Sequence, residues 1–191
     1  IGTSGIGKSS FMYCGIFPVL YGDYKSSYSS QWEIYTCRPG ISPIKNLALA
    51  LNENPALVDL SEEAKETIKN IETTLLQESS LGLIEAIKSR YQRSPKNYLI
   101  FIDQFEELFR FKNIDANTIE EAAAFVKLLL AAVQQTDIPI YVVITMRADF
   151  LGDCSQYPNL TKLINSSQFL IPQMTRNEKR RAIMGPVQVM N

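Results

Sequence analysis

Two unbroken apolar stretches stand out in the second half of the chain. Residues 98–102 read Tyr-Leu-Ile-Phe-Ile, and residues 138–146 read Ile-Pro-Ile-Tyr-Val-Val-Ile-Thr-Met. The first stretch ends at Asp103 and the second ends at Arg147. Short apolar runs without alternation are typical of strands that are buried on both faces of a parallel sheet. The pattern therefore predicts two such strands, each followed by a charged residue at its carboxyl end.

Two weaker patterns predict further strands. Residues 32–37 are rich in aromatic and β-branched side chains, and the turn residues Arg38-Pro39-Gly40 follow them. A shorter apolar run, Phe169-Leu170-Ile171, is expected to form another short strand. The stretch 22–30 is polar and turn-rich, which predicts a loop.

Helical patterns separate these strands. Ser61 followed by two acidic residues is typical of a helix N-cap, and Thr175 with Glu178 fits a capping box. The first helix is expected to end close to Phe17-Pro18. Strands that alternate with helices imply an α/β fold with a parallel sheet. The predicted helices are 8–16, 44–51, one that opens after Ser61, 81–91, 120–135 and one from Thr175 to Gly185-Pro186.

The composition narrows the possible chemistry. The 191 residues suit one domain, or one domain with the start of another. A formal net charge of −1 gives no overall attraction to nucleic acid or to an anionic membrane. The chain has no histidine, which removes histidine acid–base chemistry and histidine metal ligands. Three dispersed cysteines favour a reducing, cytoplasmic location, and no apolar run approaches the ~18 residues that span a bilayer.

The first residues of the chain match a phosphate-binding loop, Gly-x-x-x-x-Gly-Lys-Ser. Glycines permit positive φ, so that successive backbone N–H groups can surround a phosphate at the start of a helix. Lys8 would reach the β- and γ-phosphates, and the Ser9 hydroxyl would join a Mg²⁺ shell. The alternative is an ordinary Gly/Ser turn before a helix. The nucleotide-binding candidates are Gly2, Thr3, Ser4, Gly5, Ile6, Gly7, Lys8, Ser9 and Ser10.

Acidic residues follow the most apolar strand. The carboxyl ends of parallel strands line the ligand crevice, so Asp103 is expected beside the phosphate loop, where it can hold Mg²⁺. Glu106 and Glu107 lie one turn further on, and either of them can orient and deprotonate an attacking water. The alternative is that both glutamates only occupy the first turn of a helix, where acidic residues are favoured.

Arginines follow two of the predicted strands. Arg147 is a candidate to sense or neutralise the γ-phosphate, and the alternative is an ion pair with Asp149 or Glu106. Arg38 is a weaker candidate, because its strand is expected at the edge of the sheet.

These motifs together resemble the novel STAND NTPase 1 family. The resemblance rests on the loop Gly2–Ser9, on Leu99-Ile100-Phe101-Ile102-Asp103-Gln104-Phe105-Glu106-Glu107-Leu108-Phe109, and on Thr145-Met146-Arg147-Ala148-Asp149-Phe150-Leu151. Trp32 with Arg38-Pro39-Gly40-x-x-Pro43 and Ile183-x-Gly185-Pro186 add to it, so that the likeness covers nearly the whole chain.

The resemblance implies a fold and a role for each candidate residue. It implies a three-layer P-loop NTPase with the 51432 strand order, in which the strand before Gly2 lies in the middle of the sheet. That strand is expected to be truncated here, which suggests a piece of a longer protein and leaves neighbouring strand edges unpaired. Asp103 then corresponds to the metal ligand, the acids after it to the hydrolytic residues, and Arg147 to a sensor. The expected domains are 1–172, the NTPase domain, and 173–191, the start of a helical subdomain.

The function expected from this resemblance is that of a signal-transduction switch that binds ATP with Mg²⁺ and hydrolyses it slowly. Such proteins place the switch between an effector domain and WD40-like repeats, and the nucleotide state controls homo-oligomerisation. A nucleotide-binding scaffold with little turnover and a P-loop kinase remain alternatives. A GTPase is disfavoured, because the chain lacks the DxxG and NKxD patterns.

Overall fold

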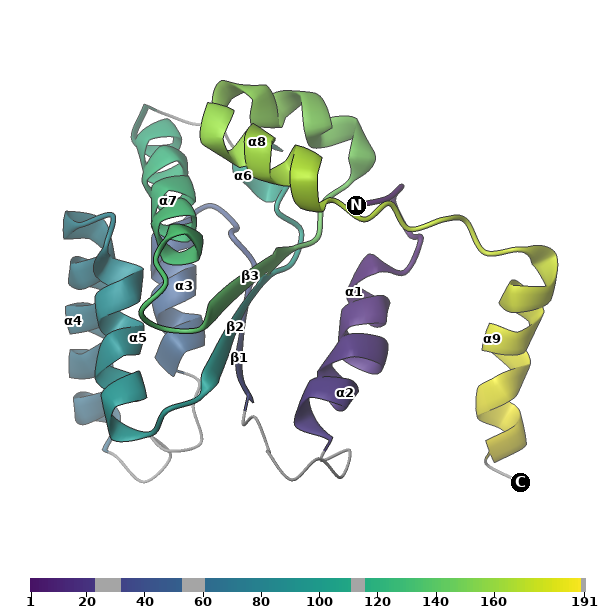
Figure 1. The fold of residues 1–191 in the computed structure, drawn as a ribbon, viewed down its shortest axis with the longest axis horizontal. Helices are drawn as coiled ribbons and strands as arrows, with labels where there is room; N and C mark the ends of the chain where they lie inside the picture. Colours follow the sequence, from purple (N-terminus) through teal and green to yellow (C-terminus); the bar gives the residue numbers. More distant parts are fainter. Residues whose placement is uncertain (23–31, 53–60, 111–115, 190–191) are drawn as a thin grey trace.

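The structure, a computed structural model, describes residues 1–22, 32–52, 61–110 and 116–189 (Figure 1). Its centre is a parallel three-stranded sheet in the order β1-β2-β3. The strands are β1 Trp32–Cys37, β2 Asn97–Ile102 and β3 Ile140–Ile144. Cys37 pairs with Ile102, and Ile102 pairs with Ile144, so the three strands end side by side. The expected mixed α/β fold with a parallel sheet is confirmed, and the residues after each strand meet at one edge.

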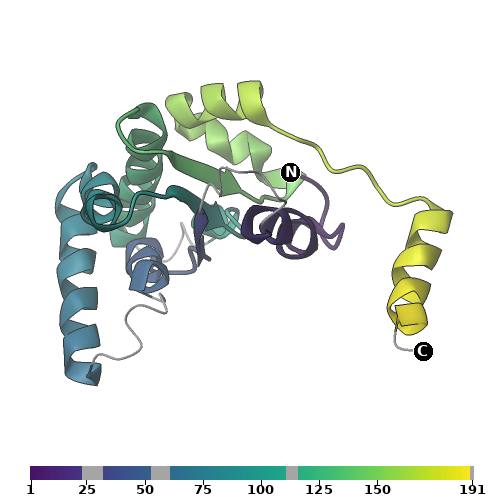
Figure 2. The same ribbon diagram turned by 60° about the horizontal axis from the view of Figure 1, so that its bottom comes forward.

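Helices cover both faces of the sheet, as Figures 1 and 2 show. α3, α5 and α7 lie on one face with α4 packed outside α3 and α5, whereas α1 and α2 lie on the other face. The helices are α1 Lys8–Phe11, α2 Phe17–Tyr21, α3 Pro43–Asn52, α4 Glu62–Glu78, α5 Gly82–Arg93, α6 Glu107–Arg110, α7 Ala116–Gln134, α8 Pro158–Ser167 and α9 Arg176–Val189.

β2 joins two hydrophobic cores. Successive side chains of a strand point to opposite faces, so alternate residues of β2 enter alternate cores. Tyr98, Ile100 and Ile102 belong to the larger core under α3, α5 and α7, and Leu99 and Phe101 belong to the smaller core under α1 and α2. All five side chains are at most 3% exposed, which explains why this stretch is apolar without alternation.

The second apolar stretch forms a shorter and more exposed strand than predicted. Only Ile140–Ile144 of residues 138–146 is a strand, and Tyr141 is 50% exposed. β3 pairs with β2 on one side, and within the described residues the other edge has only a bridge between Gly2 and Arg147. The prediction of burial on both faces is therefore wrong for this strand, because burial depends on neighbouring elements and not on composition alone.

The first helical segment runs past the expected stop at Phe17-Pro18 and ends at Tyr21. A π-helix, Met12–Ile16, lies between α1 and α2 and ends just before the proline. Proline lacks a backbone donor and crowds the preceding turn, and a widened turn accommodates both effects. The helix continues because Phe17 is held in the smaller core, with its ring 5.3 Å from the ring of Phe101.

The remaining helix predictions agree with the structure in position. The Ser61 hydroxyl accepts a hydrogen bond from the Ala64 amide at 3.3 Å, as an N-cap does. α7 begins at Ala116, about one turn before the predicted start. The loop predicted at 22–30 lies, apart from residue 22, outside the described residues.

The predicted strand at Phe169-Leu170-Ile171 is not a strand in the structure. Its backbone is hydrogen-bonded to a single residue, because Ile1 N donates to Phe169 O at 2.9 Å and Ile171 N donates to Ile1 O at 2.9 Å. One paired residue is too short for a ladder. The segment nevertheless lies directly beside the start of the phosphate loop.

The last helix begins as predicted. Thr175 N donates to the Glu178 carboxylate at 2.7 Å, and Glu178 N donates to the Thr175 hydroxyl at 3.3 Å, which completes a capping box. The helix runs beyond Gly185 to Val189, further than expected. Figure 2 shows α9 away from the sheet, on the far side of α1 and α2. The domain division between residues 172 and 173 stays a prediction.

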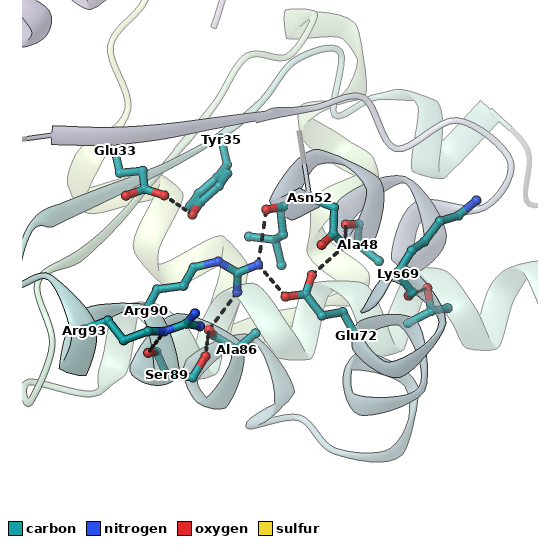
Figure 3. Close-up of polar contacts among 12 residues, drawn as sticks. Glu33, Tyr35, Ala48, Asn52, Lys69, Glu72, Ala86, Ser89, Arg90 and Arg93 are labelled. Atoms are coloured by element: carbon teal, nitrogen blue, oxygen red, sulfur yellow. Dashed lines mark hydrogen bonds and ion pairs between the residues drawn. The ribbon is translucent and has the colours of Figure 1, made fainter. Parts of the chain in front are cut away.

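A polar cluster connects α3, α4 and α5, which lie on the same side of the sheet (Figure 3). Arg90 of α5 forms an ion pair with Glu72 of α4, and the two side chains are 14% and 12% exposed. Arg90 also donates to Leu51 O of α3 at 3.2 Å, and Asn52 Nδ2 donates to Glu72 at 2.8 Å. The guanidinium lies 5.9 Å from the ring centre of Tyr35 in β1. The ion pair therefore fixes α4 and α5 against α3 and the sheet.

Arg90→Ala leaves the Glu72 carboxylate without its cation, and we expect the free energy of unfolding to fall by about 3 kcal/mol. The pair Glu72→Leu with Arg90→Met removes both charges and is expected to cost less than Arg90→Ala alone. Urea denaturation measures both changes. The control is Lys88→Ala, an exposed residue of the same helix, with an expected change within about 0.5 kcal/mol. Equal losses for Arg90→Ala and Lys88→Ala would contradict the role of the cluster.

Candidate functional site

The amino-terminal loop has the backbone that its glycines predict. Gly5 and Gly7 have φ values of 72° and 94°, in the left-handed region that side chains rarely adopt. Gly7 is the N-cap of α1, so the loop leads straight into the first helix. The nine nucleotide-binding candidates therefore lie on one loop and the first helical turn, with Thr3, Ser4 and Gly5 exposed.

Gly2 fixes the loop to the end of β3. Gly2 N donates to Met146 O at 3.2 Å, and Ala148 N donates to Gly2 O at 3.1 Å. A Cβ atom at this position would lie 2.9 Å from Ile6 Cγ2, so a side chain here would require Ile6 to move. The phosphate loop and Arg147 are thereby held beside each other.

Lys8 folds back over the loop. Its Nζ atom donates to Gly2 O at 3.1 Å and to Thr3 O at 2.9 Å. The ammonium group thus lies against two backbone carbonyls of the loop, and its predicted contact with the β- and γ-phosphates stays a prediction.

Asp103 brings four segments of the chain together, and its side chain is 0% exposed. Its Oδ1 atom accepts hydrogen bonds from the hydroxyls of Ser9 and Thr145, each at 2.6 Å. Its Oδ2 atom accepts from Nε and Nη2 of Arg38 at 3.2 and 3.1 Å. A buried carboxylate is stable only when its oxygens are paired in this way. The structure therefore joins the two metal-ligand candidates, Ser9 and Asp103, by a direct contact.

Glu106 and Glu107 contact different neighbouring segments. The Glu106 side chain is almost buried, at 6% exposure for the residue, and accepts a hydrogen bond from Arg147 N at 3.2 Å. Glu107 begins α6 and accepts from Gly40 N at 2.9 Å. Neither residue is only an exposed acid of a first helical turn, because each carboxylate binds the backbone of another element.

The Arg147 guanidinium is paired with Asp149, which is the alternative to a phosphate-sensing role. Arg147 Nε donates to Asp149 Oδ1 at 3.1 Å, and Nη2 donates to the second carboxylate oxygen. The hydrogen bond from Arg147 holds the pKa of the Asp149 carboxyl below its usual value. Both side chains are exposed, at 36% and 55%, and an ion pair of this kind adds little stability. Only the backbone of Arg147 contacts Glu106.

A family model, Novel STAND NTPase 1, matches residues 1–191. The chain belongs to the novel STAND NTPase 1 family. Searches among curated proteins and among solved structures give no match. Membership of the STAND NTPases implies a nucleotide-binding NTPase domain that takes a nucleoside triphosphate, usually with Mg²⁺. Among the described residues, no helix combines the length and the apolar character needed to cross a membrane.

The oxygen atoms in this STAND domain suit magnesium. Mg²⁺ is commonly held by one or two protein oxygens, phosphate oxygens and water. Ser9 and Asp103 supply a hydroxyl and a carboxylate that already touch each other. The described part of the chain has no group of three or more acidic, cysteine or histidine side chains that could hold a metal by themselves. Ser9 and Asp103 could therefore hold Mg²⁺ together with the phosphate oxygens of a nucleotide.

Sequence reasoning missed Thr145 and undervalued Arg38. The signal that identifies both is strand register, since Cys37, Ile102 and Ile144 are aligned and the next residues are Arg38, Asp103 and Thr145. The Thr145 hydroxyl also accepts a hydrogen bond from Gln104 N at 3.1 Å. Gln104 has a φ of 58°, in the left-handed region. Thr145 therefore holds both the carboxylate and the turn that follows it.

Thr145→Val keeps the shape of the side chain and removes the hydroxyl. We expect the free energy of unfolding to fall by about 1–3 kcal/mol, because a buried carboxylate oxygen and the Gln104 amide each lose a partner. Thermal and urea denaturation measure the change. Thr67→Val is the matched control, since Thr67 is exposed and donates only to Glu63 O in its own helix. Equal effects of the two substitutions would contradict this account of Asp103.

Proposed function

We propose that this domain is a Mg²⁺-dependent ATPase that works as a slow switch in a larger signal-transduction protein. The observation that carries the proposal is the 2.6 Å contact between the Ser9 hydroxyl of the phosphate loop and the buried carboxylate of Asp103. Two residues distant in sequence meet there at the carboxyl edge of a parallel sheet, where such folds bind nucleotides.

In this proposal each part of the loop has one task. The backbone N–H groups of residues 2–10 surround the phosphates, and the partial positive charge at the start of α1 adds to their attraction. Lys8 binds the β- and γ-phosphates when it leaves the carbonyls of Gly2 and Thr3. Ser9 and Asp103 hold Mg²⁺, which neutralises charge on the phosphates when it is bound.

Glu106 is the better candidate for the general base. Its carboxylate contacts Arg147 N, and Arg147 forms a bridge with Gly2 at the root of the loop. Glu107 instead contacts Gly40 after β1, on the opposite side of β2. We therefore assign water activation to Glu106 and positioning of the turn after β1 to Glu107, and both carboxylates stay candidates for the catalytic residue.

Arg147 is proposed as the sensor of the γ-phosphate. Its guanidinium is bound to an exposed partner, Asp149. An exposed ion pair contributes little free energy, so replacing Asp149 by a phosphate costs little. A γ-phosphate can act as a switch only if it binds two conformations with different affinity. Exchange of partners by Arg147 would provide that difference.

We further propose that the domain acts between flanking effector and WD40-like repeat domains in the cytoplasm. The ATP state would favour homo-oligomers and effector output. Membership of the STAND family supports this arrangement. Balanced charge argues against a direct nucleic-acid partner.

We also propose that the sheet has the 51432 order. An apolar cavity of about 370 Å³ lies along the free edge of β3, lined by side chains of α1, α7, α8 and the segment 167–171. Gly2 is bonded to residues 146 and 148 on one side, and Ile1 is bonded to residues 169 and 171 on the other. An extended strand leading into Gly2 would continue both sets of bonds and fill this cavity.

Amide hydrogen exchange of the full-length protein tests the strand order. Thr145 N donates toward β2, so the amides of Val142 and Ile144 point to the opposite, free edge of β3. We expect these two amides to exchange as slowly as those of β2, because the proposed strand accepts from them. Exchange as fast as that of exposed loop amides would refute the proposed order.

Single-turnover hydrolysis of ATP by the full-length protein tests the enzymatic proposal. Glu106→Gln is expected to slow hydrolysis by about 10²-fold or more with ATP binding retained, and Glu107→Gln by less. Lys8→Ala is expected to abolish binding, because it removes the cation that contacts the phosphates. Glu85→Gln, an exposed acid of α5, is the control. Unchanged rates in both glutamate variants would contradict the catalytic assignment. If the wild type binds ATP without hydrolysing it, the domain is a nucleotide-binding scaffold and not an ATPase.

A further inference from the structure

Arg38 has an unusual position for an exposed side chain. Its guanidinium donates two hydrogen bonds to Oδ2 of Asp103, at 3.2 and 3.1 Å. The Arg38 side chain is 58% exposed, whereas that of Asp103 is 0% exposed. A planar guanidinium binds one carboxylate with more than one donor, and such contacts are stronger than neutral hydrogen bonds. The buried acid therefore receives its compensating charge from a side chain that reaches in from solvent.

The backbone that carries Arg38 is held independently of this ion pair. Asn46 Nδ2 donates to Arg38 O at 3.2 Å and to Pro39 O at 2.8 Å. Gly40 has φ of 58°, and its amide is bound by Glu107. A Cβ atom on Gly40 would lie 2.9 Å from Asn46 Nδ2, so a side chain at this position would displace the amide that binds the two carbonyls. Arg38 is thus a long, exposed side chain on a fixed turn, and it can move without the backbone.

We propose that Arg38 is the counter-ion of Asp103 in the metal-free domain and that its departure makes the carboxylate available to Mg²⁺. This inference rests on the proposed function, since it takes Ser9 and Asp103 as the magnesium ligands. A second cation beside Asp103 is repelled by the guanidinium on Oδ2, so Arg38 and Mg²⁺ compete for the same carboxylate. Arg38 therefore raises the Mg²⁺ concentration at which the domain takes up nucleotide.

The same residue stabilises the domain when no metal is bound. A buried carboxylate without a cation is costly, and Arg38 removes that cost until Mg²⁺ replaces it. Two opposite effects are expected from its removal, namely a less stable metal-free domain and a domain that binds Mg²⁺ more tightly. A purely structural arginine would produce only the first effect.

The test uses the full-length protein and a fluorescent, non-hydrolysable ATP analogue. Mg²⁺ is titrated at fixed analogue concentration in the wild type, in Arg38→Ala and in Arg38→Lys. We expect Arg38→Ala to lower the Mg²⁺ midpoint about threefold to tenfold, and Arg38→Lys to lie between it and the wild type. The melting temperature in EDTA is expected to fall in Arg38→Ala, and the gain on adding Mg²⁺ with the analogue to exceed that of the wild type.

Two further variants keep the test decisive. Arg93→Ala removes an exposed arginine near the opposite end of β2 and is expected to leave the midpoint unchanged. If Arg38→Ala does not fold, Arg38→Gln removes the charge and keeps most of the side-chain length. An unchanged or higher Mg²⁺ midpoint in the variant would overturn the proposed competition. Absence of Mg²⁺-dependent binding in the wild type would overturn the proposed function together with the inference.

Discussion

The arrangement of this domain depends on one buried carboxylate. Asp103 lies at the end of the most buried strand, and its two oxygens receive donors from Ser9, Thr145 and Arg38. These donors come from the helix after the phosphate loop and from the ends of the two neighbouring strands. Because an unpaired carboxylate in this position is costly, the requirement to satisfy Asp103 holds all four segments in register.

Two consecutive glutamates bind the backbone on both sides of β2. Glu106 binds the backbone after β3, and Glu107 binds the backbone after β1. The short turn after Asp103 thus contacts the whole carboxyl edge of the described sheet. The phosphate loop joins the same edge through Gly2 and the residues after β3. Asp103, Glu106 and Glu107 are close in sequence, but each carboxylate binds a different part of the site. Asp103 contacts Ser9, Glu106 contacts the backbone after β3, and Glu107 contacts the backbone after β1.

Local patterns in the sequence were sufficient for the mixed α/β fold with a parallel sheet, for the helix caps at Ser61 and Thr175 and for the positive φ of the loop glycines. Each of these depends on residues close in sequence, such as Thr175 and Glu178 in the capping box or Gly5 and Gly7 in the loop. The contacts of Thr145 and Arg38 with Asp103 could not be found in this way, because they depend on the register between strands that are tens of residues apart. The segment 169–171 has the composition of a strand, but strand formation depends on a partner that local sequence does not specify.

The π-helix after the phosphate loop sets the rotational phase of α2. Met12 and Phe17 are five positions apart, yet both are buried in the smaller core. In a regular α-helix, five residues correspond to about 1.4 turns, and the two side chains would diverge. The wider turn brings them to the same side. Loss of one residue between them would place the two side chains four positions apart, which is about 1.1 turns of a regular α-helix, so both could face the smaller core without the wider turn. The π-turn therefore accommodates one residue more than a regular helix needs, while both ends of the segment stay packed in the smaller core.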